Sequence, residues 1–156
     1  MMTAFGAAMA WVEGSGVAIA IRESLLLTAA LSAFHLIGAT LVGGGALLGG
    51  LRIGGVLFPD QAMADVVRPA GRAILLGLSI SIVTGALLFS PRASMAVANG
   101  FFQLKMGLLV AAAACHAILH SRRWHSEDQA SGFLGLARSM LYIAVILAGS
   151  AYILLE

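Results

Sequence analysis

The sequence predicts an all-α membrane protein: a four-transmembrane-helix bundle with a short N-terminal interfacial helix, forming one domain over residues 1–156. Of the 156 residues, 60% are hydrophobic and only 10% are charged, whereas a soluble domain carries about 25% charged residues. Four apolar stretches also reach the roughly 20 residues that cross a hydrocarbon core as a helix. Helices satisfy their own backbone hydrogen bonds, which lipid cannot do.

The N-terminal segment, residues 1–22, is apolar but is interrupted by Glu13-Gly14-Ser15-Gly16. We therefore expect an interfacial or re-entrant segment rather than a fifth span, with Trp11 near the lipid headgroups. The four spans are expected at about 24–51, 70–90, 101–120 and 133–155.

Proline and charge mark the ends of the spans. Arg68-Pro69 predicts the start of the second helix, with proline in its first turn. Ser90-Pro91-Arg92 predicts its end, and a polar loop follows the third span at residues 121–128.

The distribution of lysine and arginine predicts the orientation. Six basic residues lie in or beside the first and third loops, and three lie on the opposite side: respectively Arg52, Arg68, Arg72, Arg122, Arg123 and Arg138, against Arg22, Arg92 and Lys105. Because basic loops stay in the cytoplasm, we expect a multi-pass protein of the bacterial inner (plasma) membrane with both termini periplasmic. The basic residues form no phosphate-binding run, so nucleic acid is not expected as a partner.

Ionisable groups inside a membrane are candidates for function, because burying them in lipid is costly. His35 lies within the first span and His116 within the third, while His120 and Lys105 lie near the two ends of the third. Counted from the outer ends of their spans, His35 and His116 are expected roughly 17 Å and 22 Å deep. With boundary errors of a few residues, the two imidazoles share one level.

Two histidines at one depth, flanked by small residues such as Gly38, predict a haem b held between two helices. Neutral imidazole nitrogens are common axial ligands of haem iron. His35 and His116 would bind the metal, with His120 as the other candidate for the second ligand. Lys105 or an arginine would neutralise a propionate. A histidine in a membrane helix can also simply hydrogen-bond to a neighbouring helix.

Copper is the alternative metal, because the chain has seven methionines and thioethers bind Cu(I). They form no close cluster, however, and the single cysteine, Cys115, excludes a CxxC site. Nucleophile and phosphate-binding motifs are absent, and no carboxylate lies inside the spans, which argues against a proton-coupled transporter. Whether the chain is an enzyme stays open; if it is, an oxidoreductase or a subunit of one is expected.

Several short motifs resemble a functionally uncharacterised family of small four-helix bacterial membrane proteins. They are AIAIRES at residues 18–24, FHLIG at 34–38, Leu51-Arg52, TGALLF at 84–89 and FQLKM at 102–106. The resemblance covers most of residues 18–120. Ser32 departs from it, because the family often has an acidic residue one turn before the histidine.

The layout is more distantly similar to the haem-containing membrane protoporphyrinogen oxidase family and to the copper-resistance D family. The former pairs a histidine and a later arginine of the first helix with a lysine and a later histidine of the third. His35, Arg52, Lys105 and His116 stand in comparable places. This resemblance implies a haem b site.

The leading hypothesis is therefore a haem b-binding membrane protein for electron transfer. One form of this hypothesis makes the chain the membrane anchor subunit of a periplasmic redox partner. The alternatives are a copper-handling protein of copper-resistance D type and a cofactor-free structural subunit of a membrane complex. The expected partners are the lipid bilayer and either another membrane or periplasmic subunit or a second copy of the chain.

Overall fold

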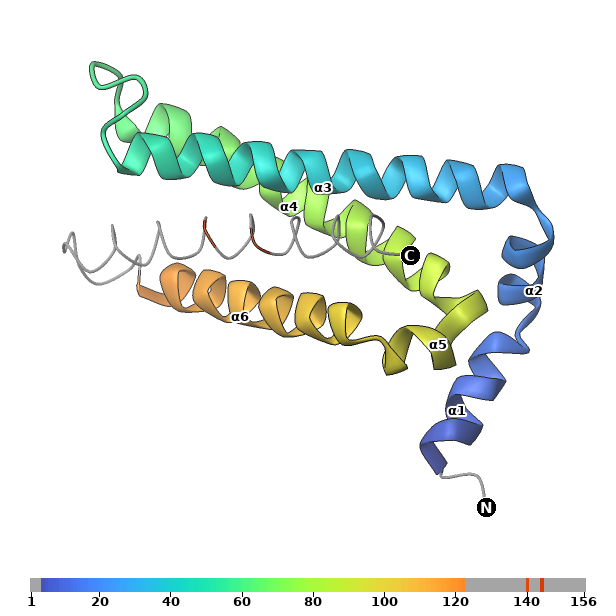
Figure 1. Ribbon diagram of the computed structural model, residues 1–156. Helices are drawn as coiled ribbons and strands as arrows, with labels where there is room; N and C mark the ends of the chain where they lie inside the picture. Colours follow the sequence, from blue (N-terminus) through green and yellow to red (C-terminus); the bar gives the residue numbers. More distant parts are fainter. Residues whose placement is uncertain (1–3, 123–139, 141–143, 145–156) are drawn as a thin grey trace.

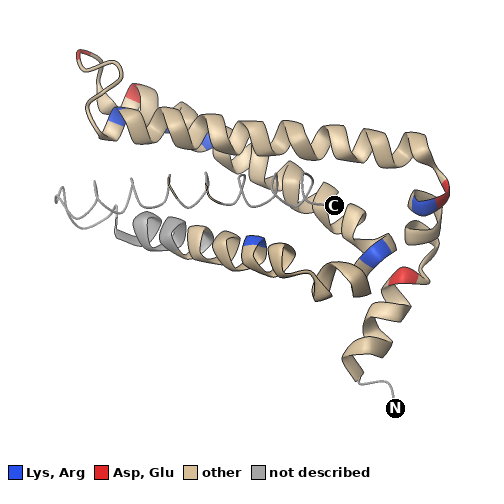
Figure 2. Ribbon diagram, in the orientation of Figure 1, with Lys and Arg blue, Asp and Glu red and all other residues tan. Residues whose placement is uncertain are grey.

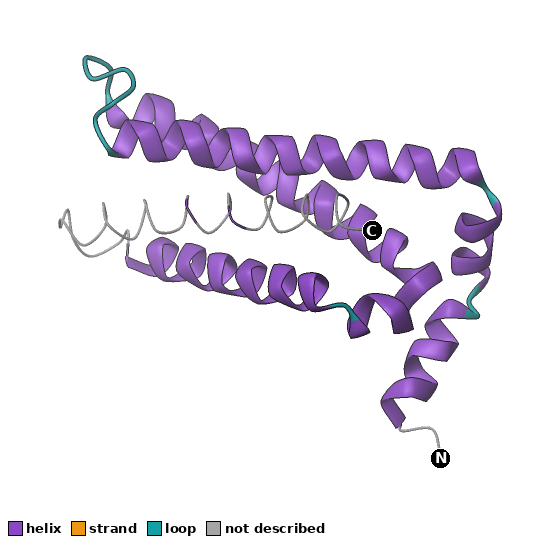
Figure 3. Cartoon of the chain, in the orientation of Figure 1, coloured by secondary structure: helices purple, strands orange, loops and turns teal. Residues whose placement is uncertain are grey.

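The computed structural model describes residues 4–122, Met140 and Ala144. Between residues 113 and 122 it describes the helical backbone and, of the side chains, that of Ala114. All elements in this part of the chain are helical (Figures 1 and 3). They are α1 (Ala4–Glu13), α2 (Gly16–Glu23), α3 (Leu25–Ile53), α4 (Met63–Phe89), the 3-10 helix η1 (Ser90–Arg92), α5 (Ala93–Ala98) and α6 (Gly100–Arg122).

Among the described residues, two helices are long and apolar enough to cross a membrane, namely α3 and the stretch that begins with α4, and a third span results if the bent pair of α1 and α2 counts as one. With 29 and 27 residues, α3 and α4 are each roughly 40 Å long, which exceeds a hydrocarbon core of about 30 Å. Their large apolar side chains are mostly exposed, as lipid-facing surfaces are; Leu36, Ile37, Leu48, Leu76 and Val83 are examples. The predicted all-α membrane fold is thus confirmed in its helical, membrane-spanning character.

The structure describes the predicted spans to different extents. The first and second predicted spans fall on α3 and α4, and the third falls on α6, which has 23 residues and whose described part, Gly100–Ala112, is apolar. The fourth predicted span, residues 133–155, lies outside the described residues apart from Met140 and Ala144. The loop 121–128 lies outside them from residue 123 onward.

Charged side chains gather at the ends of α3 and α4 and in the short helices beside them (Figure 2). The long central stretches of α3 and α4 carry none. Lys105 is different, because it lies in the second turn of α6, within an apolar segment. A lysine placed in this way needs a local reason, since an ammonium group is costly to bury in hydrocarbon.

The helices α3 and α4 pack closely through small residues. A Cβ atom added to Gly38 would lie 2.8 Å from the Gly77 carbonyl oxygen and 2.5 Å from Ser81 Oγ; one added to Gly77 would lie 2.5 Å from the Gly38 carbonyl oxygen. A Cβ on Gly45 would similarly meet the Ala70 carbonyl oxygen at 2.7 Å. Small residues thus allow the backbones of α3 and α4 to approach closely along this interface.

The N-terminal segment that was predicted as one interfacial helix consists of two short helices. α1 and α2 meet at an angle of 56°, and Ser15 caps the start of α2 by accepting a hydrogen bond from the Ala18 amide. The carboxylate of Glu13 accepts hydrogen bonds from the amide and hydroxyl of Ser94, which ties the break to the start of α5. The pair is a broken span or a re-entrant segment by length and composition.

The structure corrects the predicted start of the second long helix. α4 begins at Met63, so Pro69 lies inside the helix rather than in its first turn. Proline lacks the amide hydrogen that would bond to the Asp65 carbonyl, so α4 has one backbone hydrogen bond fewer in its second turn. The predicted end is confirmed, because α4 ends at Phe89 and Ser90–Arg92 forms η1.

Helix α6 joins the α3–α4 pair through one buried cluster. Ala112 of α6 lies with Val42 and Ala46 of α3 and Ile74 of α4. α3 and α6 run in the same direction and α4 runs opposite to both (Figure 1). The cluster therefore aligns Ala112 with the second half of α3.

Candidate functional site

His35 is half-buried on α3, and its ring contacts α4. The Nδ1 atom of His35 lies 3.0 Å from the hydroxyl oxygen of Thr84. That hydroxyl in turn donates to the Ile80 carbonyl oxygen at 2.7 Å, one turn earlier on α4. The backbone of Ser81 makes a further polar contact with the ring. The imidazole is thus held by one short stretch of α4.

The seat of the His35 ring also depends on a glycine. A Cβ atom added to Gly85 would lie 3.1 Å from His35 Cε1 and 3.5 Å from Nδ1. The first of these distances is shorter than ordinary van der Waals contact, so a larger residue would push the ring away from α4. Thr84 and Gly85, adjacent in sequence, therefore provide the hydrogen-bond partner and the space for the ring.

Lys105 of α6 interacts electrostatically with His35. The two residues come from helices that are distant in sequence and parallel in space (Figure 1). This proximity places a cationic group near an imidazole inside an otherwise uncharged part of the bundle. Of the candidate site residues predicted from the sequence, Lys105 is one that the structure brings close to His35.

Gly38 and Arg52 lie on the same helix as His35 but serve other contacts. Gly38 is buried against Gly77 and Ser81, so its small size is used for the close approach of α3 and α4. Arg52 lies 17 residues beyond His35, roughly 25 Å along the helix. Its guanidinium donates to the Gln61 carbonyl oxygen, and its side chain is only 8% exposed. Arg52 therefore lies far from the His35 ring, whereas Gly38 packs against Ser81, whose backbone contacts that ring.

His116 and His120 lie on the backbone of α6 beyond Ala112. Ala112 is aligned with Val42 and Ala46, which follow His35 by 7 and 11 residues, roughly 10–16 Å along α3. His116 lies four residues further still, so its backbone is displaced from that of His35 by roughly 15–20 Å along the bundle axis. The backbones of His35 and His116 therefore lie at different levels along the bundle, and the side chain of His116 lies outside the described residues.

The reason for the offset is the position of the helix starts. The sequence-based depths assumed that α3 and α6 begin in one plane. Instead, α3 begins beside α2 at one end of the bundle. The chain passes through η1 and α5 before α6 begins, so α6 begins further along the bundle axis than α3 (Figure 1). Depths counted from the first residue of each span therefore cannot be compared between α3 and α6.

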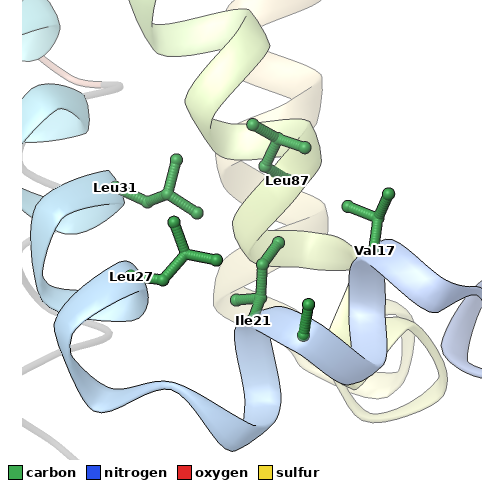
Figure 4. A pocket seen from close by; sticks show the side chains of 6 residues that line it. Val17, Ile21, Leu27, Leu31 and Leu87 are labelled. Atoms are coloured by element: carbon green, nitrogen blue, oxygen red, sulfur yellow. The ribbon is translucent and has the colours of Figure 1, made fainter.

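An apolar pocket of about 270 Å³ lies between α2, α3 and α4 (Figure 4). Only aliphatic side chains of α2, α3 and α4 line it: Val17, Ala20, Ile21, Leu27, Leu31 and Leu87. Leu31 precedes His35 by one turn of α3, and Leu87 follows Thr84 by about one turn of α4. The polar contact between His35 and Thr84 thus adjoins a wholly apolar surface.

Within the described part of the chain, no three His, Cys, Asp or Glu side chains gather into a group that could hold a metal ion. A metal at His35 would therefore need ligands beyond the side chains described, or an equatorial ligand set of its own, as the four nitrogens of a porphyrin provide. Copper handling gains no support from these residues.

Sequence reasoning missed Thr84 and Gly85 as partners of His35. A signal was present, since Gly77, Ser81 and Gly85 repeat every four residues and Thr84 shares their side of α4. Their relation to His35 depends on how α4 is placed beside α3, and spacing within one helix does not specify that placement.

Comparison of the chain with protein-family models, with curated proteins and with solved structures gave no match.

Proposed function

We propose that this protein is an integral membrane electron-transfer protein that binds haem b, with His35 as an axial ligand. In this proposal the chain crosses the bacterial inner membrane four times, and α1 and α2 lie at the outer surface. The six-to-three excess of basic residues places the α3–α4 loop in the cytoplasm and both termini in the periplasm. The proposal includes a membrane or periplasmic redox subunit as partner.

The observation that carries the proposal is the tethered imidazole of His35. Metal-binding histidines commonly direct one ring nitrogen at a hydrogen-bond acceptor, which orients the ring and leaves the other nitrogen for the metal. His35 has such an acceptor in Thr84 Oγ1. Bound haem would supply a one-electron iron couple to this position in the membrane.

Lys105 supports the proposal as a cation that interacts electrostatically with this imidazole. A haem propionate is an anion, and a neighbouring ammonium group lowers the cost of keeping it inside the protein. Arg52 is not assigned this role, because it is roughly 25 Å along α3 from His35. Apart from His35, none of the described side chains is assigned as a ligand of the haem iron in this proposal.

The first test is the optical spectrum of the protein purified from membranes after expression with a haem supply. We expect b-type α and Soret bands on reduction, at about one haem per chain, and their loss in His35→Ala. The matched control is Thr40→Val, because Thr40 is exposed on the same helix and bonds only to the Leu36 carbonyl. His116→Ala and His120→Ala decide whether either residue supplies the other ligand.

A protein that is colourless under these conditions would refute the haem assignment. Bound copper by elemental analysis, lost in His35→Ala, would favour the copper-handling alternative instead. A metal-free protein that assembles normally with His35→Ala would favour a structural subunit.

A further inference from the structure

We infer that Thr84 is a positioning residue that fixes the tautomer of His35, so that Nδ1 carries the ring proton and Nε2 is the free, ligand-binding nitrogen. The nature of the ligand rests on the proposed function. The tautomer itself does not, because it follows from the hydrogen bonds of the protein alone.

The tautomer of His35 follows from the single hydrogen of the Thr84 hydroxyl. Thr84 has a single O–H hydrogen and accepts through its oxygen lone pairs. The Thr84 hydroxyl donates this hydrogen to the Ile80 carbonyl oxygen, and the two oxygen atoms lie 2.7 Å apart. Two oxygen atoms approach this closely when a hydrogen lies between them. At the 3.0 Å contact with His35, the threonine oxygen must therefore accept, and Nδ1 must donate.

A neutral imidazole carries one ring hydrogen, so protonation of Nδ1 leaves a lone pair on Nε2. The tautomer of a histidine is set in this way by the partner of its other nitrogen. Nε2 then accepts a proton or binds a metal such as haem iron, and it cannot donate a hydrogen bond. The site therefore selects a ligand that takes an electron pair, not one that needs a donor.

Thr84 is suited to this task because it has little freedom. Its side chain is 7% exposed, its β-branch restricts χ1, and the bond to Ile80 holds the hydroxyl hydrogen on the helix side. Gly85 leaves the space in which the His35 ring lies against this oxygen. The imidazole is thereby oriented before any ligand arrives.

The test is ¹⁵N NMR of the cofactor-free full-length protein in nanodiscs, labelled on histidine and measured at about pH 8, well above the ordinary imidazole pKa. The His35 signals are identified by their loss in His35→Gln. We expect a protonated-type Nδ1 and an unprotonated-type Nε2 in the wild type. Thr84→Val, which has the same shape without the hydroxyl, should shift the ring toward the Nε2–H tautomer.

Two variants serve as controls. Thr84→Ser keeps a hydroxyl and should restore the wild-type pattern, whereas Thr40→Val removes an exposed hydroxyl elsewhere and should leave it unchanged. A wild-type ring protonated at Nε2, or a Thr84→Val spectrum identical to the wild type, would overturn the inference.

A second readout applies to haem-loaded protein. Loss of the Nδ1–H acceptor lowers the basicity of the ligand, so Thr84→Val should raise the haem midpoint potential while Thr84→Ser should not. Failure of the proposed function shows as absence of haem with the NMR result intact. Failure of the inference shows as unchanged tautomers, whether or not haem binds.

Discussion

At the scale of single residues, the position of the His35 ring depends on Gly85 of α4. Residue 85 carries no side chain, and this leaves the space for the imidazole. The polar contact to Thr84 then uses that space. A residue with no chemistry of its own thus decides where a candidate ligand can lie.

We expect Gly85→Ala to displace the His35 ring, because the added Cβ would lie 3.1 Å from Cε1. The displacement should lengthen the contact to Thr84, change the His35 ¹⁵N shifts and reduce haem retention several-fold, while the helical content stays unchanged. Gly71→Ala in the same helix is the matched control, since a Cβ there meets nothing within 4 Å. Equal haem retention and unaltered shifts in both variants would contradict this role for Gly85.

Glu13 provides a pH-dependent contact at the outer edge. Hydrogen bonds from the Ser94 side chain and amide, aided by the charge of Arg22, hold the pKa of this exposed carboxyl below its ordinary value of 4.5. The folded state therefore favours the ionised form. The contact is fully present above the ordinary carboxyl pKa and is lost as the pH falls through the lowered value.

We accordingly expect α1 to loosen from α5 on acidification below about pH 4, and Glu13→Gln to loosen it at neutral pH. Hydrogen exchange of the Ser94 amide reports the change. Glu23→Gln is the control, because it removes a carboxylate of α2 that the structure does not bond to Ser94. Exchange at Ser94 that is indifferent to both pH and Glu13→Gln would show that another contact holds α1.

At the scale of elements, α3 and α4 form one unit because glycines let their backbones meet. Hydrophobic burial contributes little between helices in lipid, so packing contacts of this kind hold the pair together. Ser81 Oγ lies buried against Gly38 and makes no hydrogen bond within the described part of the structure. Shape, rather than polar bonding, therefore joins the two helices at this point.

Gly77→Ala should weaken that unit. Its Cβ would lie 2.5 Å from the Gly38 carbonyl oxygen, 2.7 Å from Leu41 Cβ and 2.9 Å from the Val42 amide nitrogen. Two of these are backbone atoms, so the helices must separate. We expect a loss of about 1–3 kcal/mol in the free energy of unfolding, measured by denaturation in mixed micelles. Gly71→Ala should have little effect, and an equal loss there would exclude interface packing as the cause.

At the scale of the whole molecule, the charges gather at the ends of the long helices and leave Lys105 within the bundle (Figure 2). This pattern fits a protein oriented by its basic loops. Orientation also determines which side of the membrane His35 is closer to, because it lies nearer the α2 end of α3. In the proposed topology that end is periplasmic.

Cysteine labelling tests the orientation. After Cys115→Ser, Val56→Cys in the exposed α3–α4 loop should react with an impermeant maleimide only in opened cells, whereas Met95→Cys in α5 should react in intact spheroplasts. The reversed pattern would invert the topology and place the site near the cytoplasmic face. Labelling of neither position in opened cells would place both within lipid.

The sequence by itself determined that long helices span a membrane, because transfer into hydrocarbon depends on composition summed over about 20 residues of one segment. It also singled out His35 and Lys105, since ionisable groups in such segments are rare. Only the tertiary structure decided that Thr84 and Gly85 hold the His35 ring, that Gly38 and Arg52 serve other contacts, and that His116 lies at another depth. These relations depend on the register between helices, which is set by how closely their small residues let them pack. No spacing within a single helix encodes that register.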